Sequence, residues 1–334
     1  MSFQPDFTNH TWLDSAAAQL FCLDDPDYPG CENVENRYEY RINLAANIAF
    51  LAIFGTSLLG YLGVYAWARI GTGFTVALSL GVLCEILGYA GRTMSYYNQW
   101  EDIGFYIQIC CLTFGPAFMA AGIYLCLRRI VVAFGRENSR IPPEYYTRIF
   151  IPCDLIALVL QALGGALAAS DDDPQIGTNI MIAGLGFQVA TGAGFIIAAS
   201  DFAIRAFRRY RALGSTAFDQ STDLVHMRSS LPFRGFIGAL ALASLCILVR
   251  SCFRVAELSE GWRGPLMGRQ DFFIGFEGVL IVVACLVLNV FHPAICMRPV
   301  LVGGGGLKGF SFLRKRTAEK DLIKMSNRNG SEST

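Results

Sequence analysis

Seven long apolar stretches constrain the fold of this 334-residue chain more than any other feature of its sequence. Each is close to the roughly 20 residues that an α-helix needs to cross the hydrocarbon core of a bilayer. Charged residues make up only 16% of the chain, whereas soluble domains carry about 25%, so the composition fits lipid as the solvent. We therefore predict an all-α polytopic membrane protein, a bundle of seven transmembrane helices. Those helices are expected at about residues 43–66, 74–95, 103–127, 149–169, 178–201, 235–257 and 271–292.

The apolar stretches divide the chain into three parts. Residues 1–42 form an acidic N-terminal tail, with eight Asp or Glu against two Arg, and residues 43–292 form the seven-helix domain. Residues 293–334 form a basic tail that we expect to be mostly disordered. The fourth and fifth stretches are rich in Gly and Ala, which let membrane helices approach closely, so we expect these two helices to lie inside the bundle.

The distribution of basic residues predicts the orientation in the membrane. Twenty Lys and Arg residues fall in the first, third and fifth loops and the C-terminal tail, and four fall on the opposite side. The positive-inside rule then places the N-terminus outside and the C-terminus in the cytosol. Asn9 begins an Asn-His-Thr sequon on the outer side and is a candidate for glycosylation. Cys22 and Cys31 lie on the same oxidising side and are candidates for a disulfide.

Three charged residues end the sixth apolar stretch. Arg250, Arg254 and Glu257 follow the apolar run without a break, and their spacing places them on one face of a helix. A charge at the bilayer centre costs at least ~2.5–3.5 kcal/mol, so such residues usually face a bundle interior or a water-filled cavity. The alternative is that Glu257, and with it Arg254, already lies at the headgroup level and snorkels.

The second stretch carries a similar face, formed by Glu85, Tyr89 and Arg92. Glu85 and Arg92 lie two turns, about 10.5 Å, apart along the axis, so each needs a partner on another helix. For Glu85 we expect that partner to be Arg250 or Arg254. For Arg92 we expect it to be Glu257 or Glu277.

These charged faces and the polar residues of the other helices form a candidate substrate-binding site, a polar spine through the bundle. Its members are Glu85, Tyr89, Arg92, Gln108, Asp154, Gln161, Gln188, Arg250, Arg254, Glu257 and Glu277. The alternative is that they only hold helices together, since interhelical polar contacts contribute roughly 0.6–2 kcal/mol each. We favour that alternative for the Gln residues. Buried ions are costly enough that residues serving only to hold helices together would be expected to be uncharged. This favours a functional role for the charged members Glu85, Arg92, Asp154, Arg250 and Glu277.

Several kinds of chemistry do not fit the sequence. All four lysines lie at position 308 or later, so no helix offers a Schiff-base lysine. His10, His226 and His292 fall in three separate regions and do not form a zinc site, and no His-x-x-x-His pair exists. The Gly303–Lys308 run lacks the Gly-Lys-Ser/Thr ending and the preceding strand of a phosphate loop. We expect no enzymatic activity, no cofactor, no metal and no nucleic-acid partner.

The motifs at these positions resemble the fungal RTA-like family, also called lipid-translocating exporters, over about residues 40–295. They are Glu85-x-x-Gly-Tyr-x-Gly-Arg92; Gln108 followed by Pro116-x-x-x-Ala-Ala-x-x-Tyr124; Asp154-x6-Gln161-x-x-Gly-Gly165; Gly184-Leu-x-x-Gln188; Arg250-Ser-x-x-Arg254-x-x-Glu257-x-x-x-Gly261; and His292-Pro293. The resemblance implies a seven-helix protein linked to export or flipping of sphingoid long-chain bases and to resistance to toxic amphiphiles; one branch is linked to porphyrin uptake. The chain departs from the family at Leu127-Arg128, where Gly-Arg is common, and at Gln270-Asp271, where a Glu is common.

The resemblance and the polar spine predict a transporter of membrane lipids or similar amphiphiles, with sphingoid bases as the expected substrate, in the plasma membrane and with a possible homo-oligomeric state. A seven-helix receptor or a lipid- or porphyrin-sensing signalling protein is the alternative, because topology alone does not separate the two. The usual receptor signatures are missing, since Leu127-Arg128-Arg129 and Asn289-Val-Phe-His-Pro293 stand in their places. A lipid-modifying membrane enzyme is a third possibility, but no nucleophile–base or metal set supports it.

Overall fold

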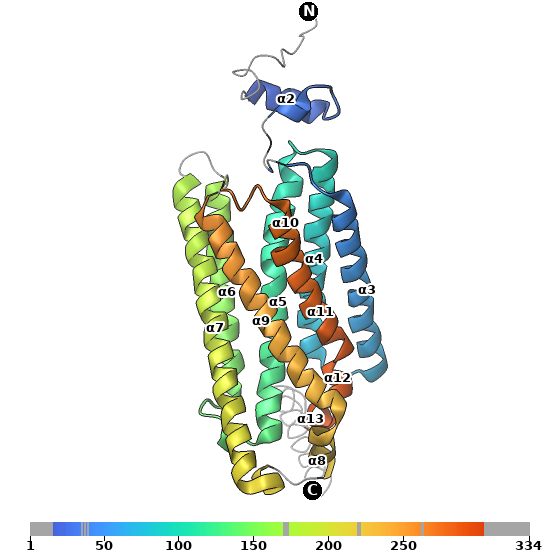
Figure 1. Cartoon of the computed structure of the whole chain (residues 1–334), viewed down its shortest axis with the longest axis vertical. Coiled ribbons are helices and arrows are strands. Elements are labelled where there is room, and N and C mark those ends of the chain that lie inside the picture. Colours follow the sequence, from blue (N-terminus) through green and yellow to red (C-terminus); the bar gives the residue numbers. More distant parts are fainter. Residues whose placement is uncertain are drawn as a thin grey trace, which may run out of the picture.

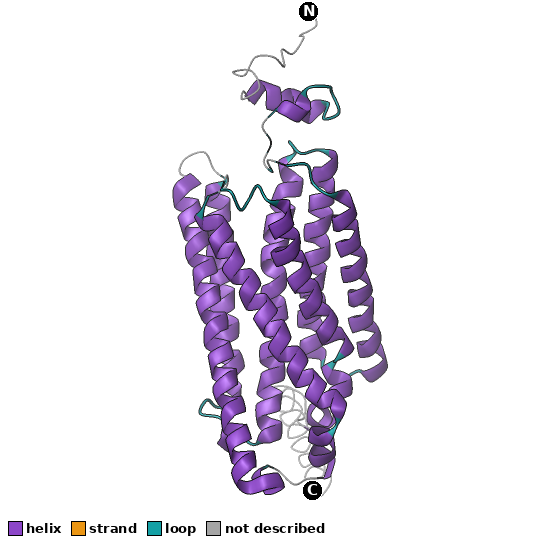
Figure 2. Ribbon diagram, in the orientation of Figure 1, coloured by secondary structure: helices purple, strands orange, loops and turns teal. Residues whose placement is uncertain are grey.

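A computed structural model describes residues 16–34, 36, 38, 40–169, 174–218, 222–261 and 264–303 of the chain. Helices account for nearly all of the described residues, which contain no β-strand (Figure 2). The sequon at Asn9 and residues 304–334 lie outside the described residues. The all-α fold class is therefore confirmed.

Within the described residues, seven helical spans are long and apolar enough to cross a membrane, and they lie side by side as one bundle (Figure 1). They are α3 (Leu44–Ala68), α4 (Thr72–Tyr97), α5 (Asp102–Phe134), α6 (Pro143–Ala168), α7 (Pro174–Leu213), α9 (Leu231–Ser259) and a seventh span over Gln270–Cys296. The seventh span consists of α10 (Gln270–Phe272), a π-helical segment (Phe273–Val279), α11 (Leu280–Val290) and α12 (Pro293–Cys296). This confirms a multi-pass membrane protein.

Several helices extend beyond the predicted bounds. From the apolar stretches we predicted that the third helix ends at residue 127 and the fifth at residue 201. In the structure α5 continues to Phe134 and α7 to Leu213. Hydropathy marks only the part of a helix that lies in hydrocarbon, and nothing in the following polar residues breaks the helix. At α5 the break comes with Gly135, whose φ of 99° favours glycine.

Short elements complete both ends of the bundle. They are α2 (Ala16–Asp24), three 3₁₀ turns (Cys31–Asn33, Arg136–Asn138 and Gly214–Ala217), α8 (Thr222–Ser229) and α13 (Arg298–Gly303). The predicted disulfide between Cys22 and Cys31 is present and closes the segment after α2. The side chain of Asn98, at the end of α4, donates to the Leu23 carbonyl (3.0 Å), so α2 is tied to the bundle.

The first residues of the predicted C-terminal tail are helical. Residues 293–303 form α12 and α13, and Met297 and Val300 are buried. The side chain of His292 caps α12 by accepting from the Ala294 N–H (3.1 Å), and Pro293 is well suited to a first helical turn. These local signals continue the helical structure beyond the last apolar stretch.

The placement of α6 and α7 also corrects the sequence prediction. The two Gly-rich helices pack along one another at one side of the bundle, and α5 is the most buried span (Figure 1). Their small residues serve this pairing: a Cβ on Gly177 of α7 would lie 2.1 Å from the backbone nitrogen of Ala168 in α6. Small residues thus indicated a close helix pair, but not its place in the bundle.

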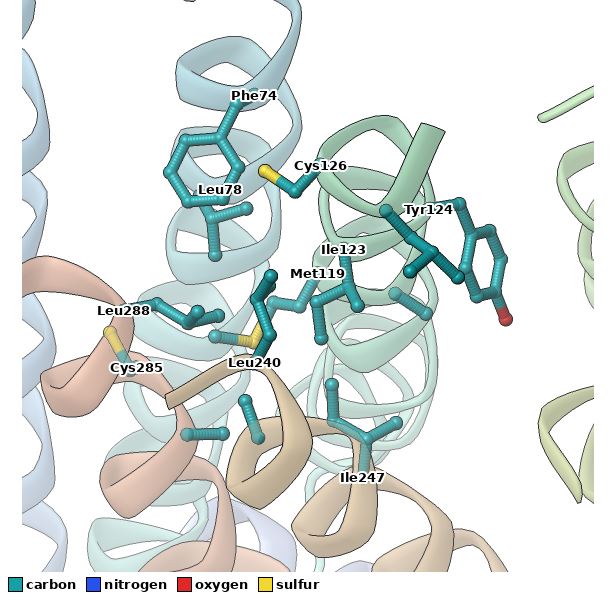
Figure 3. Packing of buried hydrophobic residues seen from close by; sticks show 14 of the residues in the cluster. Phe74, Leu78, Met119, Ile123, Tyr124, Cys126, Leu240, Ile247, Cys285 and Leu288 are labelled. Carbon is teal, nitrogen blue, oxygen red and sulfur yellow. The ribbon is translucent and has the colours of Figure 1, made fainter. Parts of the chain in front are cut away.

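A large apolar core fills the part of the bundle that lies away from α2. Figure 3 shows Phe74 and Leu78 of α4, Met119 of α5, Leu240 of α9 and Leu288 of α11 converging there. The same core continues to Phe50 and Phe273, so the buried charged residues of α4, α9 and the seventh span lie beside apolar side chains.

Candidate functional site

The candidate site is built around Glu85, which α4 directs against α5. Its side chain is 1% exposed, and neither carboxylate oxygen has a hydrogen-bond partner among the described residues. The carboxylate fits beside α5 because residue 115 is glycine: a Cβ there would lie 2.5 Å from Glu85 Oε1. Glycine in this helix interior therefore makes room for a buried acid.

The next residue of α5 creates a second polar feature. Pro116 has no N–H, so it cannot donate to the carbonyl of Leu112 one turn earlier. Arg250 of α9 takes that place, with its Nη2 donating to the Leu112 oxygen at 2.5 Å. The same guanidinium donates to Glu277 in the seventh span, and both side chains are almost fully buried. One arginine therefore joins α5, α9 and the seventh span.

Glu277 lies in the π-helical segment Phe273–Val279. A π segment inserts an extra residue per turn and often marks a functional position in a helix. Glu277 is 1% exposed, and its Oε2 has no partner within the described part of the chain.

Nearer α2, a second layer holds another ion pair and a third arginine. Arg254 Nη1 donates to Glu257 Oε2 at 2.5 Å, one turn further along α9. Arg92 of α4 donates to the Tyr40 hydroxyl (2.6 Å), and its guanidinium lies 3.9 Å from the centre of the Phe273 ring. All three charged side chains are buried.

Gln108 completes this layer from α5. Its Oε1 accepts from the hydroxyl of Tyr38 (3.0 Å), which stands with Tyr40 in the segment before α3. A cavity of about 20 Å³ lies between the residues of this second layer and that segment. The lining residues are Tyr38, Tyr40, Arg92, Phe105, Gln108, Ile109, Arg254, Glu257, Met267 and Phe273.

We call the buried group formed by Glu85, Tyr89, Arg92, Arg250, Arg254, Glu257 and Glu277 the charge cluster. Its three carboxylates and three guanidinium groups balance in formal charge. Glu85 lies within electrostatic range of both Arg250 and Glu277, and Tyr89 lies within range of Glu85 and Arg92. Because Glu257 and Glu277 already bind arginines, Glu85 is the carboxylate of the cluster that keeps both oxygens available.

The predicted pairings inside the cluster were wrong. Glu85 does not hydrogen-bond Arg250 or Arg254 in the described structure, and Arg92 bonds Tyr40 rather than Glu257 or Glu277. Arg250 and Arg254 instead bind the two glutamates that we had assigned to Arg92. Glu257 stands on α9 itself, one turn after Arg254, and Glu277 of the π segment binds Arg250 of the same helix.

Three predicted members lie in a separate polar group on the side of the bundle. The Tyr124 hydroxyl of α5 donates to Asp154 Oδ2 of α6 (2.8 Å), and Gln161 of α6 donates to Gln188 of α7 (3.0 Å). Asp154 makes its hydrogen bond with Tyr124 and not with any member of the charge cluster. The single spine predicted from the sequence is therefore two groups.

Several contributors were not singled out by sequence reasoning. Tyr38 and Tyr40 precede the first apolar stretch, where no helical periodicity applies, and Phe273 looked like an ordinary apolar residue. Pro116 did carry a signal, because a proline in a helix interior frees a carbonyl for another donor. In the described ranges, no three His, Cys, Asp or Glu side chains gather as a metal site would require.

Comparison with known proteins places the chain among fungal membrane proteins. The sequence pattern of the family described as "RTA1 like protein" matches residues 78–299. The sphingoid long-chain base transporter RSB1 of Saccharomyces cerevisiae is 31% identical over 280 residues, which cover 77% of this chain and 73% of RSB1. Protein RTM1 of the same organism is 30% identical over 64% of this chain and 66% of its own, and protein RTA1 is 26% identical over 77% and 85%. No solved structure matches the chain.

Proposed function

Because this chain belongs to the RTA1-like protein family, we propose that it is a transporter that moves amphiphiles across a membrane, with sphingoid long-chain bases as its substrates. The name of the relative RSB1 supports this substrate class, since that protein is a sphingoid long-chain base transporter. The seven-span fold is consistent with a transport role. We further propose that the membrane is the plasma membrane and that the end bearing α2 faces outward, because the loops that are rich in Arg lie at the other end.

The observation that carries the proposal is the charge cluster with its free carboxylate. A sphingoid base has a cationic amine, hydroxyl groups and a long chain that is stable in lipid. Its head crosses the hydrocarbon only if polar groups replace its water, because an uncompensated charge there is costly. Glu85 offers two acceptor oxygens inside the bundle, and the arginines beside it offer donors to hydroxyl or phosphate groups. We infer that the head group passes along this cluster while its tail stays in lipid.

A purely structural role explains the cluster less well. Ion pairs buried in a low-dielectric interior stabilise a fold no better than well-packed apolar residues of similar size. An unpartnered Glu85 beside the Arg250–Glu277 pair makes the arrangement costlier still. A role in binding the substrate head group would explain why these charges are buried in spite of the energetic cost.

The test is accumulation of labelled sphingoid base in cells that are sensitive to it. Cells that express the protein should accumulate less base, and Glu85→Gln should abolish the difference, because the amide removes the negative charge at nearly constant size. Glu260→Gln is the matched control, since Glu260 is exposed just after α9. Surface expression is measured for every variant. Equal accumulation with and without the intact protein would refute the proposal for this substrate.

A further inference from the structure

A second cavity, distinct from the charge cluster, lies between α5, α6, α7 and α9. Its volume is about 30 Å³, close to that of one small polar group or water. Polar atoms enter it from all four helices. They belong to Tyr124, Asp154, Gln188, Ser244 and Ser251.

Asp154 gives the cavity its charge. The residue is 5% exposed, Oδ2 accepts from the Tyr124 hydroxyl, and Oδ1 has no hydrogen-bond partner among the described residues. Arg250 and Arg254, in contrast, bind Glu277 and Glu257 in the charge cluster. The carboxyl group of Asp154 thus has a hydroxyl as its neighbour, where the other two acids have guanidinium groups.

The hydroxyl groups of the cavity are arranged to accept and not to donate. The Tyr124 hydroxyl donates its hydrogen to Asp154. Ser244 donates to the Leu240 carbonyl (2.7 Å) and Ser251 to the Ile247 carbonyl (2.9 Å), both within α9. Their lone pairs therefore remain for a ligand, together with Asp154 Oδ1. Gln188, whose Oε1 accepts from Gln161, is the wall residue that carries N–H donors.

A wall of this kind suits a small cation that has several hydrogens to donate. A primary ammonium carries one positive charge and three N–H donors, and charge-assisted hydrogen bonds are the stronger kind. The Gln188 amide suits a hydroxyl on the carbon next to the amine. The chemistry of the wall therefore matches an amino alcohol better than an anion or a neutral ligand.

The cavity also lies where a lipid tail has an exit. Gly192 and Ile196 of α7 and Ser244 and Leu248 of α9 line it, and all four are half-exposed on the outer surface of the bundle. In a membrane this surface faces acyl chains. A ligand whose head reaches Asp154 can leave its chain between α7 and α9, in lipid.

We propose that this cavity is the binding site for the primary ammonium head of a single-chain amphiphile that enters sideways from the bilayer between α7 and α9. The inference rests on the proposed transport function and divides it between two sites. The Asp154 cavity holds the amine, and the charge cluster provides the polar path beyond it. Binding and movement then depend on different carboxylates.

The experiment measures binding to the purified full-length protein in lipid nanodiscs, with a tritiated sphingoid base as the probe. Octadecylamine and the N-acetylated base serve as competitors, because acetylation removes the charge and keeps the tail. Asp154→Asn should weaken binding of both amines by about tenfold or more and leave competition by the N-acetylated base unchanged. Asp201→Asn, which changes a half-exposed carboxylate on α7, is the matched control.

A second variant covers the case in which Asp154→Asn fails to fold. Gly192→Leu leaves the carboxylate in place and fills the opening; a Cβ at this position meets Leu248 Cδ1 at an ordinary 3.5 Å. Gly192→Leu should weaken the binding of the amines as strongly as Asp154→Asn does. Unchanged amine affinity in Gly192→Leu or in folded Asp154→Asn would overturn the site. Equal losses for charged and neutral competitors in Asp154→Asn would overturn it too. Amine binding that depends on Asp154 in a protein without effect on cellular accumulation would refute transport and leave the site standing.

Discussion

Arg250 holds the charge cluster together, and Arg250→Met is the perturbation that measures how much it contributes. The native guanidinium donates to Glu277 and to the Leu112 carbonyl, and all of these atoms are buried. Methionine keeps an unbranched apolar stem but is shorter than arginine, and it leaves a carboxylate and a carbonyl without their donor. Breaking a buried ion pair by removing one partner costs about 3–5 kcal/mol. We therefore expect Arg250→Met to lower the free energy of unfolding by about 4 kcal/mol.

The partner substitution should cost less, because the structure offers Arg250 a second acid. In Glu277→Leu, the guanidinium keeps the Leu112 carbonyl and lies within electrostatic range of Glu85, whose oxygens have no hydrogen-bond partner in the described structure. The double variant removes both charges and resembles an apolar replacement of the pair, which is often close to neutral. Its loss should fall short of the sum of the single losses by about 2 kcal/mol or more.

These losses are measured by denaturant unfolding of the purified variants in detergent micelles. Arg209→Met is the control, because Arg209 pairs with the exposed Glu137 and such surface pairs contribute about 0–1 kcal/mol. Two results would refute the reasoning. The first is an Arg250→Met loss no larger than that of the control, and the second is additivity of the two single losses.

Two further predictions test the helix irregularity and the orientation. Pro116→Ala restores an N–H to α5 for the Leu112 carbonyl, so the variant should unfold less readily and transport sphingoid base more slowly; an unchanged transport rate would separate the proline from function. If the N-terminus faces outward in the cell, endoglycosidase should shift the electrophoretic mobility of the intact protein and not that of Asn9→Gln; a native protein without such a shift would contradict the predicted orientation.

The sequence predicted the helices well, because the length of an apolar stretch follows directly from the thickness of the bilayer. It also predicted which residues are buried in spite of their charge: Glu85, Arg92 and Arg250 are each at most 2% exposed. Helical spacing identifies the face on which a residue lies. That face must turn inward when lipid is the alternative.

The partners of those residues were beyond the reach of helical spacing. A pairing depends on how two helices are rotated and shifted against one another, and the π segment changes that register just before Glu277. Arg92 found its partner in Tyr40, which belongs to a segment with no periodicity to interpret. Asp154 was assigned to the wrong group because its spacing with Gln161 describes one face of α6 and says nothing about which neighbour that face meets.

The charge cluster lies where two helices interrupt their own backbone hydrogen bonding. Within the hydrocarbon, every backbone polar group needs a partner inside the protein, so an interruption of a membrane helix is costly unless a side chain completes it. Arg250 meets both interruptions, since it binds the carbonyl that Pro116 releases in α5 and the glutamate that the π segment presents. Helices bend most readily at prolines and π segments. A shift of α9 against either helix would therefore move Arg250, which interacts electrostatically with Glu85. The movement would change how readily the Glu85 carboxylate can bind a head group. The residues proposed to bind the substrate during transport thus lie beside Pro116 and the π segment, where the helices bend most readily.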